Sequence, residues 1–306
     1  MTRLDVLCVG VATLDRLVVV DALPGDDERV LVDPFVVAGG GPAATAAVAL
    51  ARLGARVALS TVVGSDEAGR QVLAGLEAEG VDLRWAEVRD DVRTTESIVF
   101  VNRRRQTRTI VTTPSRAPAP GSVPVAVAPW VHVDQTGYSA VRAAMSSSPA
   151  VPSLSVDAGN GIDDLDLAGI ALYAPTLGRL QARHPTGDIA ASLSAARTAG
   201  AATVVATAGS DGAYVLDGDE LVHVPAVATD VVSTLGAGDV FHGALLAAVV
   251  AGAGHVQAVR IAAAAAAASC RALDGRSAIP RVADPRDLLE VELGSFKQEP
   301  DGVAQR

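Results

Sequence analysis

The chain has 306 residues, of which 49% are hydrophobic and 20% charged, so a large core is available and a mostly disordered chain is excluded. Aromatic residues make up only 3%, the formal charge is −10, and Lys297 is the only lysine. Because nucleic-acid binding draws on clustered positive charge, this balance argues against a nucleic-acid partner. Any bound anion must therefore be held by backbone amides or by a few arginines.

Cysteine and histidine usage gives no metal or disulfide pattern. Cys8 and Cys270 are too few for a disulfide framework, neither has zinc-spaced neighbours, and the five histidines are scattered singly. We therefore predict no metal site built from side chains. The Ala-rich runs 244–253 and 261–268 are shorter than the roughly 18 residues of a membrane span and indicate buried helices. Val6–Gly10 indicates a first strand rather than a signal peptide, so we expect a cytoplasmic protein without a membrane partner.

Short β-branched runs alternate with longer Ala-rich stretches after the first strand. The predicted strands are Val57–Val63, Val131–Asp134, Ser153–Asp157, Ala201–Ala206 and Ala213–Leu216. The predicted helices are Ala43–Leu53, Gly69–Glu79, Ser192–Ala199 and Val240–Val250. Strands that alternate with helices of this kind predict βαβ units, and hence an α/β fold with a mostly parallel sheet covered on both faces.

Two regions break that rhythm. Residues 16–37 and 94–112 are rich in strand formers but carry no helical pattern. Thr94–Phe100 and Arg108–Thr112 flank a polar stretch and predict a hairpin. We interpret the two regions as one small β subdomain inserted into the α/β domain. The Pro- and Ala-rich segment 117–129 is predicted to be a linker or surface loop.

The strongest local motif is Ser233–Phe241, in which Gly236-Ala237-Gly238 precedes Asp239 and an Ala-rich helix. A glycine turn at a helix N-terminus exposes consecutive backbone amides where the helix dipole also favours negative charge, which makes an anion hole. The acid at its mouth either caps the helix or acts as a general base for a hydroxyl attacking a bound phosphate. Taken alone, the motif leaves both interpretations open.

A second glycine cluster, Gly39–Ala44, opens the helix that ends near Leu53. It matches a dinucleotide-binding fingerprint, but it is not the first βα turn, and Pro42 removes an amide where pyrophosphate would need one. About 20 residues on, where an acid should hold the ribose, the chain has Ala58–Thr61. The remaining interpretations are tight helix–strand packing or a glycine-lined sugar site.

Two further elements carry polar groups. Thr207–Ala213 is a polar glycine loop after a predicted strand, and in an open α/β sheet ligands bind outside the carboxyl ends of strands. It is equally compatible with an ordinary β-turn. Asp15 follows closely on the first strand and is placed to accept hydrogen bonds from sugar hydroxyls, or to serve as a turn residue.

Together these motifs resemble the PfkB (ribokinase-like) carbohydrate kinase family over nearly the whole chain. Gly40–Gly54, continued by Val63–Gly69, is similar to the family's N-terminal signature, and Gly236–Ala244 is similar to its C-terminal signature. The resemblance implies a single three-layer α/β/α ribokinase-like domain over residues 1–306. It also implies a mostly parallel sheet, and a small β-sheet lid from about 16–37 and 94–112 that often forms a dimer interface.

The resemblance also implies site residues and cofactors. Asp239 would be the catalytic base, with the amides of Gly236, Ala237 and Gly238 as the anion hole. The donor would be ATP with Mg²⁺, bound along Thr207, Gly209, Ser210 and Gly212. The sugar would contact residues of the lid and of the first glycine turn: Asp15, Arg29, Gly40, Gly41, Thr45, Arg108 and Thr112. We therefore expect a homodimer whose partner molecules are ATP and a small sugar.

The chain departs from the family pattern at two places. Ser233 and Leu235 replace an Asp and a Thr that usually precede the anion hole, and that Asp supports a monovalent-cation site in several members. The family's Asn-x-x-Glu magnesium motif should fall near residues 173–176, where neither residue is present. The metal would then be held mainly through water and the ATP phosphates.

Within the family, the chain most resembles the sulfofructose kinase and ketohexokinase-like branch. The similarity lies in Cys8–Gly10, Leu14–Arg16, Gly39–Val48, Gly238–Leu245 and the C-terminal residues Arg271, Gly275-Arg276 and Ile279-Pro280. The Asn and Arg associated there with sulfonate recognition would fall near Thr112 and Thr136, where neither is present.

We therefore predict an ATP-dependent kinase that phosphorylates a primary hydroxyl of a ketohexose-type sugar, either fructose-like or 6-deoxy-6-sulfofructose. The alternatives are a non-catalytic sugar- or nucleotide-binding pseudokinase, or a ribokinase or nucleoside kinase of the same family. The scarcity of aromatic residues leaves few side chains to stack against a nucleoside base.

Overall fold

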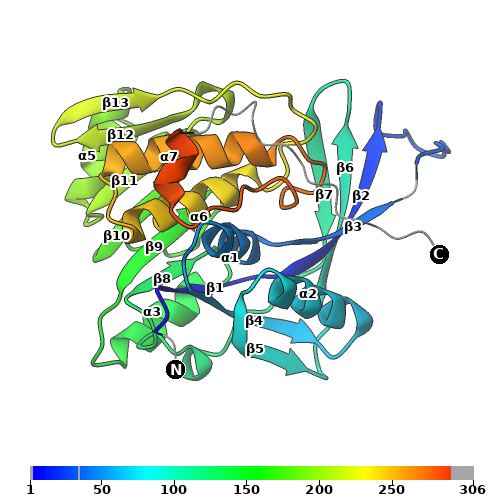
Figure 1. Cartoon of the computed structure of the whole chain (residues 1–306), viewed down its shortest axis with the longest axis horizontal. Helices are drawn as coiled ribbons and strands as arrows, with labels where there is room; N and C mark the ends of the chain where they lie inside the picture. Colours follow the sequence, from blue (N-terminus) through cyan, green and yellow to red (C-terminus); the bar gives the residue numbers. More distant parts are fainter. Residues whose placement is uncertain (1–2, 34, 291–306) are drawn as a thin grey trace.

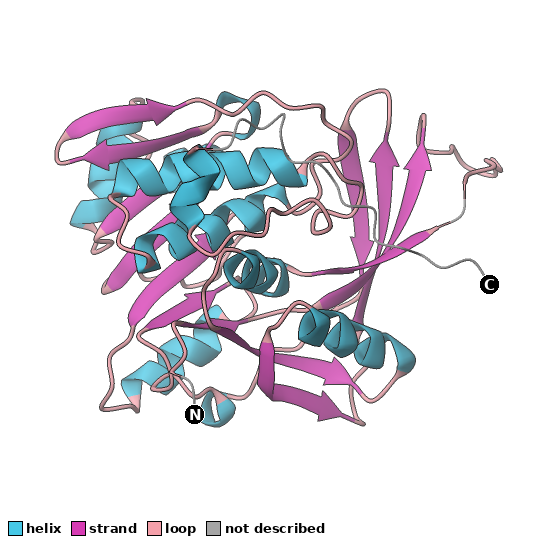
Figure 2. Ribbon diagram, viewed as in Figure 1, coloured by secondary structure: helices cyan, strands magenta, loops and turns pink. Residues whose placement is uncertain are grey.

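The computed structural model describes residues 3–33 and 35–290. They form a three-layer α/β/α arrangement with a nine-stranded sheet between two helical layers, and a four-stranded sheet projects from one side (Figures 1 and 2). This is the predicted fold class. None of the described helices is long and apolar enough to cross a membrane. Lys297 and the polar tail around it lie outside the described residues.

The large sheet has the strand order β13-β12-β11-β10-β9-β8-β1-β4-β5. All neighbours from β11 to β5 pair in parallel, and an antiparallel hairpin of β12 and β13 extends the opposite edge. The strands are β1 Val6–Val9, β4 Val57–Gly64, β5 Asp82–Arg89, β8 Trp130–Val133, β9 Ser153–Ala158, β10 Ile170–Pro175, β11 Thr203–Thr207, β12 Ala213–Asp217 and β13 Glu220–Val224. The carboxyl ends of the parallel strands therefore meet at one edge, where ligands bind in open α/β sheets.

Helices cover both faces of this sheet (Figure 1). One face packs against α1 Pro42–Arg52, α2 Glu67–Ala78, α6 Ala237–Val250 and α7 His255–Ser269. The other face packs against α3 Tyr138–Ser146, α4 Leu177–Arg183 and α5 Ile189–Thr198. Successive strand residues point to opposite layers, as Cys8 joins the first core and Leu7 the second.

Small side chains allow these helices to approach closely. At Gly243, on α6, a Cβ atom would lie only 2.6 Å from the carbonyl oxygen of Ala46 on α1. Tyr173 is the one aromatic among the largest fully buried side chains of the described residues, which otherwise are Leu and Ile. The low aromatic content is thus explained by a core of aliphatic residues with Ala and Gly between the layers.

The small sheet has the order β3-β2-β6-β7 and comprises β2 Thr13–Val20, β3 Val36–Gly40, β6 Thr95–Asn102 and β7 Thr107–Thr112. The predicted hairpin is present as the antiparallel pair of β6 and β7. The first predicted segment was too short at both ends. Gly39 and Gly40, which indicated a turn, pair with Leu14 and Thr13 as strand residues, and residues 21–33 contain no strand.

Several helix boundaries also differ from the prediction because the capping residues lie outside the apolar pattern. The Asp66 side chain accepts a hydrogen bond from Gly69, so α2 begins at Glu67, and Asp188 caps α5, which begins at Ile189 rather than Ser192. The predicted loop 117–129 contains only the 3₁₀ turn Pro120–Ser122. Two more 3₁₀ turns lie at Gly209–Asp211 and Pro285–Leu289.

Candidate active site

A cavity of about 410 Å³ lies between the carboxyl edge of the large sheet and the inner face of the small sheet. Hydroxyl, amide and carboxylate side chains line it, together with a few aliphatic ones, and none of its described lining residues is aromatic. With one exception, every residue predicted to contact the sugar lines it: Asp15, Gly40, Gly41, Thr45, Arg108 and Thr112. The exception is Arg29, which is exposed in the segment 21–33 and does not line the cavity.

The small sheet supplies a polar wall to this cavity. Asp15 pairs with Ser97, which in turn pairs with Thr112, so the three side chains share the inner face of the sheet. Asp15 is buried, and its Oδ1 accepts a hydrogen bond of 2.7 Å from the Thr13 hydroxyl. The sequence placed Asp15 just past the first strand. It lies instead within β2, because β1 ends at Val9 and the chain turns directly into the small sheet.

The glycine turn between β3 and α1 forms the floor of the cavity. A Cβ atom at Gly40 would lie 2.0 Å from Asp15 Oδ2, and one at Gly41 would lie 2.4 Å from the Val11 carbonyl oxygen. Gly41 also has a φ of 93°, which other residues rarely adopt. The floor of the cavity is therefore formed by backbone without side chains, and the Asp15 carboxylate can lie directly against Gly40.

The start of α6 closes the other end of the cavity. Gly236 caps the helix with a left-handed φ of 72°, and no side chain caps the first turn. The Ala237 amide donates a 3.3 Å hydrogen bond to the Thr234 carbonyl, whereas the amides of Gly236 and Gly238 bond to no described residue. The first turn of this helix thus presents free donors to an anion.

Asp239 stands on this first turn and lines the cavity. Burial raises the pKa of its carboxyl to about 7, and repulsion from Asp157 and Asp134 adds to the rise, while His242 and Arg108 oppose it. A carboxyl with a pKa near 7 has the basicity that suits a general base at neutral pH. The chemistry available here is proton abstraction next to a bound anion.

Behind Asp239, α6 carries His242 into a buried contact with the large sheet. His242 Nδ1 lies 2.7 Å from Asp157 Oδ2 at the carboxyl end of β9. Burial lowers the pKa of His242, but the Asp157 carboxylate outweighs it and leaves the pKa raised. The sequence treated His242 as one of five scattered histidines, because only the fold brings β9 beneath the second turn of α6.

Arg108 connects the small sheet to the anion-hole loop. Its Nη1 donates a 3.0 Å hydrogen bond to the Thr234 hydroxyl, two residues before Gly236. It is the one cationic side chain among the described residues that line the cavity, which also holds the carboxylates of Asp15, Asp239 and Asp274. The neighbouring residues Arg103–Arg105 lie in the exposed turn of the hairpin between β6 and β7.

The residues predicted to bind the nucleotide lie along the same edge of the sheet but outside the cavity. Thr207 ends β11, Gly209 and Ser210 form a 3₁₀ turn, and Gly212 leads into β12. A Cβ atom at Gly212 would lie 2.1 Å from the Val224 carbonyl oxygen, whereas one at Gly209 would meet nothing within 4 Å. Gly212 is thus required by the hairpin itself, while Gly209 borders open space.

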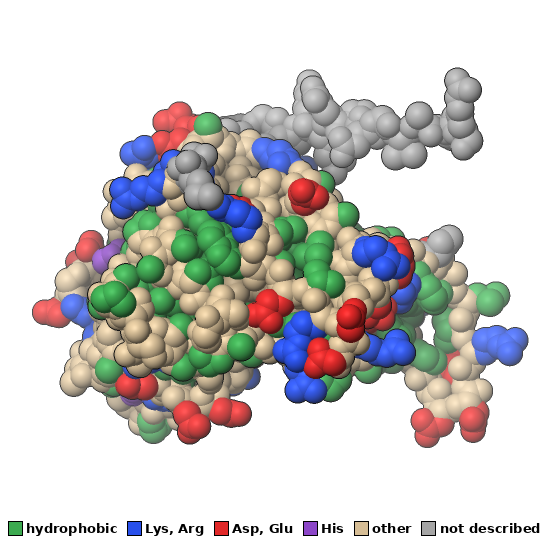
Figure 3. Space-filling model, turned by 90° about the horizontal axis from the view of Figure 1, so that it is seen from below, with side chains coloured by type: hydrophobic (Ala, Val, Ile, Leu, Met, Phe, Trp, Pro, Cys, Tyr) green, Lys and Arg blue, Asp and Glu red, His purple; other side chains and the backbone are tan. Residues whose placement is uncertain are grey.

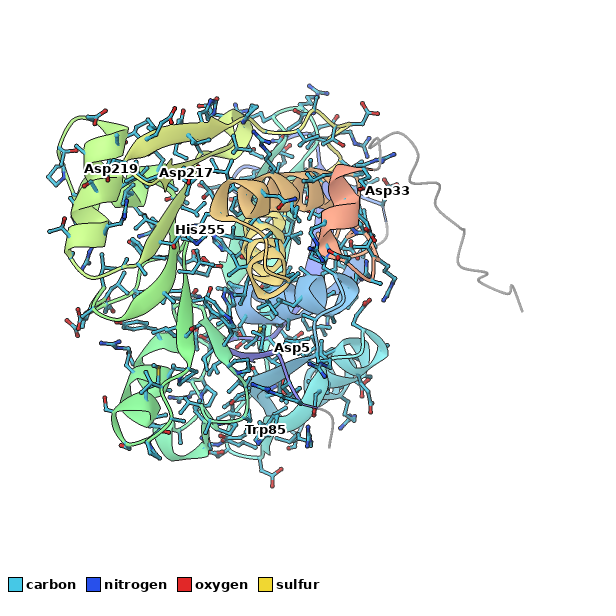
Figure 4. All side chains as sticks on the ribbon, turned by 60° about the vertical axis from the view of Figure 1, so that its left-hand side comes forward. Asp5, Asp33, Trp85, Asp217, Asp219 and His255 are labelled. Atoms are coloured by element: carbon cyan, nitrogen blue, oxygen red, sulfur yellow. The ribbon has the colours of Figure 1, made fainter. Side chains whose placement is uncertain are left out.

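No group of three or more His, Cys, Asp or Glu side chains in residues 3–33 and 35–290 is arranged to hold a metal ion. Of the acidic residues labelled in Figure 4, Asp217 and Asp219 lie together at the β12–β13 turn, whereas Asp5 and Asp33 lie apart from them and from each other. The positions where the family's magnesium motif should fall offer no carboxylate either, because they are Tyr173, Ala174, Pro175 and Thr176, at the end of β10 and the N-cap of α4. The described side chains therefore do not fit a protein-held divalent ion.

Several residues of the site were missed by sequence reasoning, among them Asn160, Asp274 and Asp134. Asn160 and Asp274 line the cavity. Asp134 fixes the backbone segments next to it through hydrogen bonds to their amides. The Asp134 carboxylate accepts hydrogen bonds from the amides of Val11 and Ala43, at 2.8 and 3.3 Å, and from two amides that start α3. Burial raises its pKa to about 6 against these donors. Its place at the carboxyl end of a predicted parallel strand was the signal available.

Comparison with known proteins identifies the family. The profile described as "pfkB family carbohydrate kinase" matches residues 3–148 and 177–281. The chain belongs to this family, and its class is that of the ATP-dependent sugar kinases, as predicted. It is 28% identical over 213 residues to an uncharacterized sugar kinase from Archaeoglobus fulgidus, covering 64% of this chain and 84% of that protein. It is 37% identical over 83 residues to a ribokinase from Bacillus subtilis, covering 27% of this chain and 28% of that protein.

Solved structures share the fold along almost the whole chain. The ribokinase from Thermotoga maritima superposes with a TM-score of 0.80 at 20% identity, covering 94% of this chain and 100% of that one. The Arabidopsis thaliana ribokinase complexed with ribose and ATP gives 0.76 at 22% identity, covering 97% and 100%. A nucleoside kinase from Methanocaldococcus jannaschii gives 0.78 at 18% identity, covering 94% and 97%.

Proposed function

We propose that this protein transfers the γ-phosphoryl group of ATP to a primary hydroxyl of a ketohexose-type sugar. The observation that carries the proposal is the position of Asp239, which faces a hydroxyl-lined cavity and stands on the first turn of a helix where the amides of Gly236 and Gly238 bond to no described residue. A base and an anion-binding helix start at one point are what phosphoryl transfer to an alcohol requires.

In the proposed reaction, the sugar lies on the glycine turn with its hydroxyls on Asp15 and the polar inner face of the small sheet. Asp239 takes the proton from the attacking hydroxyl, whose oxygen forms a bond to the γ-phosphorus as the bond to the β-phosphate oxygen breaks. The amides at the start of α6 stabilise the charge on the transferred group, and Arg108 stabilises it from the side of the small sheet.

ATP is proposed to lie along Thr207–Gly212, on the β11 side of the anion hole. This loop is at the same edge of the sheet as the cavity, and Gly209 borders open space there. Mg²⁺ is proposed to arrive with the ATP phosphates, whose charge it neutralises. The described side chains provide no site of their own for it, so every step assigned to the protein is a contact or a proton transfer.

The chemistry of the cavity supports a sugar over a nucleoside as acceptor. Its wall carries the hydroxyls of Thr13, Thr45, Thr95, Ser97 and Thr112 and no described aromatic ring. Such a wall matches a polyhydroxylated substrate, whereas a purine or pyrimidine lacks a stacking partner. Three carboxylates against one lining arginine favour a neutral sugar such as fructose, with 6-deoxy-6-sulfofructose and ribose as competing acceptors.

The homodimer through the small sheet is part of the same proposal. Val37, Ile98 and Val111 share its outer face, since Val37 pairs with Arg16, Arg16 with Ile98, and Ile98 with Val111. They are 46%, 44% and 60% exposed. The projecting segment at the right of Figure 3 adds further hydrophobic side chains. A second copy that covers this face in the cytoplasm, where ATP is available, would remove the apolar surface from water.

The test is an ADP-release screen with purified protein, Mg-ATP and a panel of fructose, tagatose, 6-deoxy-6-sulfofructose, ribose and nucleosides. We expect release above background with a ketohexose, and product phosphorylated at a primary hydroxyl. ADP release only with ribose or only with a nucleoside would identify the protein as a ribokinase or a nucleoside kinase instead. A protein that binds sugar in calorimetry but releases no ADP with any of them would be a pseudokinase.

A further inference from the structure

Arg276 is a buried guanidinium next to the cavity that forms no ion pair with any described carboxylate. It is 9% exposed. Its Nε donates a 3.0 Å hydrogen bond to the Thr45 hydroxyl and its Nη2 donates a 2.7 Å bond to the Gly40 carbonyl. Both acceptors belong to the cavity wall. Buried charges are normally paired, so the position of Arg276 calls for a specific role.

The backbone around Arg276 is fixed independently of its side chain. Its carbonyl accepts a 2.7 Å hydrogen bond from Arg52 Nη1, and Arg52 is itself held by Glu79 in an ion pair of 2.7 Å. Its amide donates to Asp274 Oδ1 at 3.2 Å, and Asp274 lines the cavity. The guanidinium thus reaches the glycine turn from an anchored loop, not from a mobile one.

Gly39 provides the space that the guanidinium occupies. A Cβ atom on Gly39 would lie 2.4 Å from Arg276 Nη1. Gly39 is an extended strand residue without a positive φ, so its backbone conformation suits alanine as well. The absence of a side chain at this position is therefore explained by contact with Arg276.

Charge completes the arrangement. Burial lowers the pKa of Arg276 to about 10, and Asp15, Asp239 and Asp274 oppose that shift. The guanidinium is still cationic at neutral pH. It adds a second positive charge, after that of Arg108, next to a cavity that gathers three carboxylates around an uncharged substrate.

We propose that Arg276 is a positioning residue for the acceptor sugar. It holds the Gly39–Gly41 turn and the Thr45 hydroxyl in place, and its charge stabilises the ionised carboxylates that accept the sugar hydroxyls. The proposal rests on the proposed function, since it assigns Arg276 to acceptor binding and not to the nucleotide or to proton transfer.

Kinetics of Arg276→Lys and Arg276→Ala test it, with the panel sugar that the wild type phosphorylates fastest as the probe. Loss of two hydrogen bonds from a charged donor predicts a rise in acceptor KM of about 10- to 100-fold for Arg276→Ala. The rise is smaller for Arg276→Lys, and kcat and the KM for ATP stay within about 3-fold. The matched control is Arg281→Ala, on the same segment and exposed, which pairs with Glu79 at 2.7 Å and should leave all three constants unchanged.

Gly39→Ala gives a second test that does not depend on removing the arginine. The added methyl group should displace the guanidinium and raise the acceptor KM in the same way. In the double variant Gly39→Ala/Arg276→Ala the methyl group has no guanidinium to displace, so acceptor KM should equal that of Arg276→Ala alone. Additive effects would mean that the methyl group simply fills the cavity and would overturn the proposal, as would equal changes in the KM values for sugar and ATP.

A crystal structure of Arg276→Ala separates this proposal from the proposed function. A displaced Gly39–Gly41 turn supports the positioning role, and an unmoved turn overturns it, whichever sugar is the substrate. If the wild type releases no ADP with any sugar, the proposed function fails, and the structure of the variant still decides the role of Arg276.

Discussion

The two sheets of this protein differ in how their faces are covered. The large sheet is covered by helices on both faces, and its carboxyl edge places the anion-hole helix over a buried Asp157–His242 contact. The small sheet has a polar inner face on the cavity and an outer face that exposes Ile98 and Val111. In the proposed reaction, rigid packing of the large sheet would set the position of the base and of the phosphoryl group, while the small sheet would supply the sugar contacts.

This difference separates two kinds of experimental effect. Changes at the edge of the large sheet should act on kcat or on folding, because that layer fixes reacting groups in a close-packed core. Changes on the small sheet should act on acceptor binding and on assembly. Each of the following changes tests that division, in order of decreasing effect.

Asp239→Asn should have the largest effect. Removing a general base while keeping the shape of the side chain should lower kcat by about 10²- to 10⁴-fold with little change in fold. Steady-state ADP release with saturating sugar and ATP measures it, with circular dichroism as the check on folding. Asp219→Asn, on the exposed β12–β13 turn labelled in Figure 4, is the matched control and should retain full turnover. A near-normal kcat in Asp239→Asn would contradict the assignment of Asp239 as the general base.

The pH dependence of kcat follows from the environment of the same carboxyl. Burial and repulsion from Asp157 raise its pKa to about 7, and only the deprotonated form accepts a proton. Turnover should therefore be constant above pH 8 and fall about 10-fold per unit below pH 6. His242 and Arg108 lower the pKa of Asp239, while Asp134 adds to the repulsion. His242→Gln should thus move the acid limb to higher pH.

The control for this profile is His255→Gln, since His255 is exposed at the start of α7 and is labelled in Figure 4. Its acid limb should coincide with that of the wild type. A kcat that does not change between pH 5.5 and 8.5 would contradict the assignment of Asp239 as the titrating base, unless a pH-independent step such as product release limits turnover. Single-turnover measurements distinguish these two cases.

The sequence predicted the fold and many of the residues that line the cavity, but not the contacts between residues far apart in the chain. Asp239 and the glycines before it could be picked out because they are contiguous in the sequence. A glycine turn followed by an acid at the start of a helix indicates an anion-binding site without reference to distant residues. Asp157 and Arg276 were not assigned a role, because their partners lie 85 and 231 residues away in the chain. Only the packing of α1 and α6 together on one face of the large sheet brings such groups together.

Strand boundaries show the same limit. Gly39 and Gly40 have low strand propensity, and their pairing with β2 is imposed by the small sheet as a whole. β5, with Asp82 and Arg89 at its ends and a half-exposed pattern, has no continuous apolar run to predict it. Where local pattern and tertiary pairing agree, as in β4, the predicted and observed strands differ by one residue.

Assembly is the next effect in size. Ile98→Lys or Val111→Lys places a charge on the outer face of the small sheet and should raise the dimer dissociation constant about 10- to 100-fold, since an interface apolar contact is replaced by a desolvated charge. Sedimentation equilibrium over a concentration series measures it. Val151→Lys, at a residue 83% exposed and away from the small sheet, is the control. A wild type that stays monomeric at high micromolar concentration would contradict the dimer.

The smallest effects compare two helical glycines under the same substitution. In Gly243→Ala the new Cβ would lie 2.6 Å from the Ala46 carbonyl oxygen and 2.8 Å from Ala49 Cβ, so α6 and α1 must separate. Overpacking of this kind should reduce the free energy of unfolding by about 1–3 kcal/mol. Gly75, in the exposed face of α2, would meet nothing within 4 Å, and Gly75→Ala should increase that free energy by about 0.5–1 kcal/mol.

Urea unfolding of the two variants, followed by circular dichroism at one protein concentration, measures both changes. Opposite signs are expected because only the alanine at position 243 collides with α1. Helix propensity favours alanine equally at both sites, so the difference between the two changes in unfolding free energy reports the contact between α1 and α6. If both variants gain stability, the helices can move apart without cost, and the anion-hole helix is then less firmly fixed than the large sheet implies. That outcome would also weaken the expected separation between effects on kcat and effects on acceptor binding, since the assignment of kcat effects to the large sheet assumes a rigid α6.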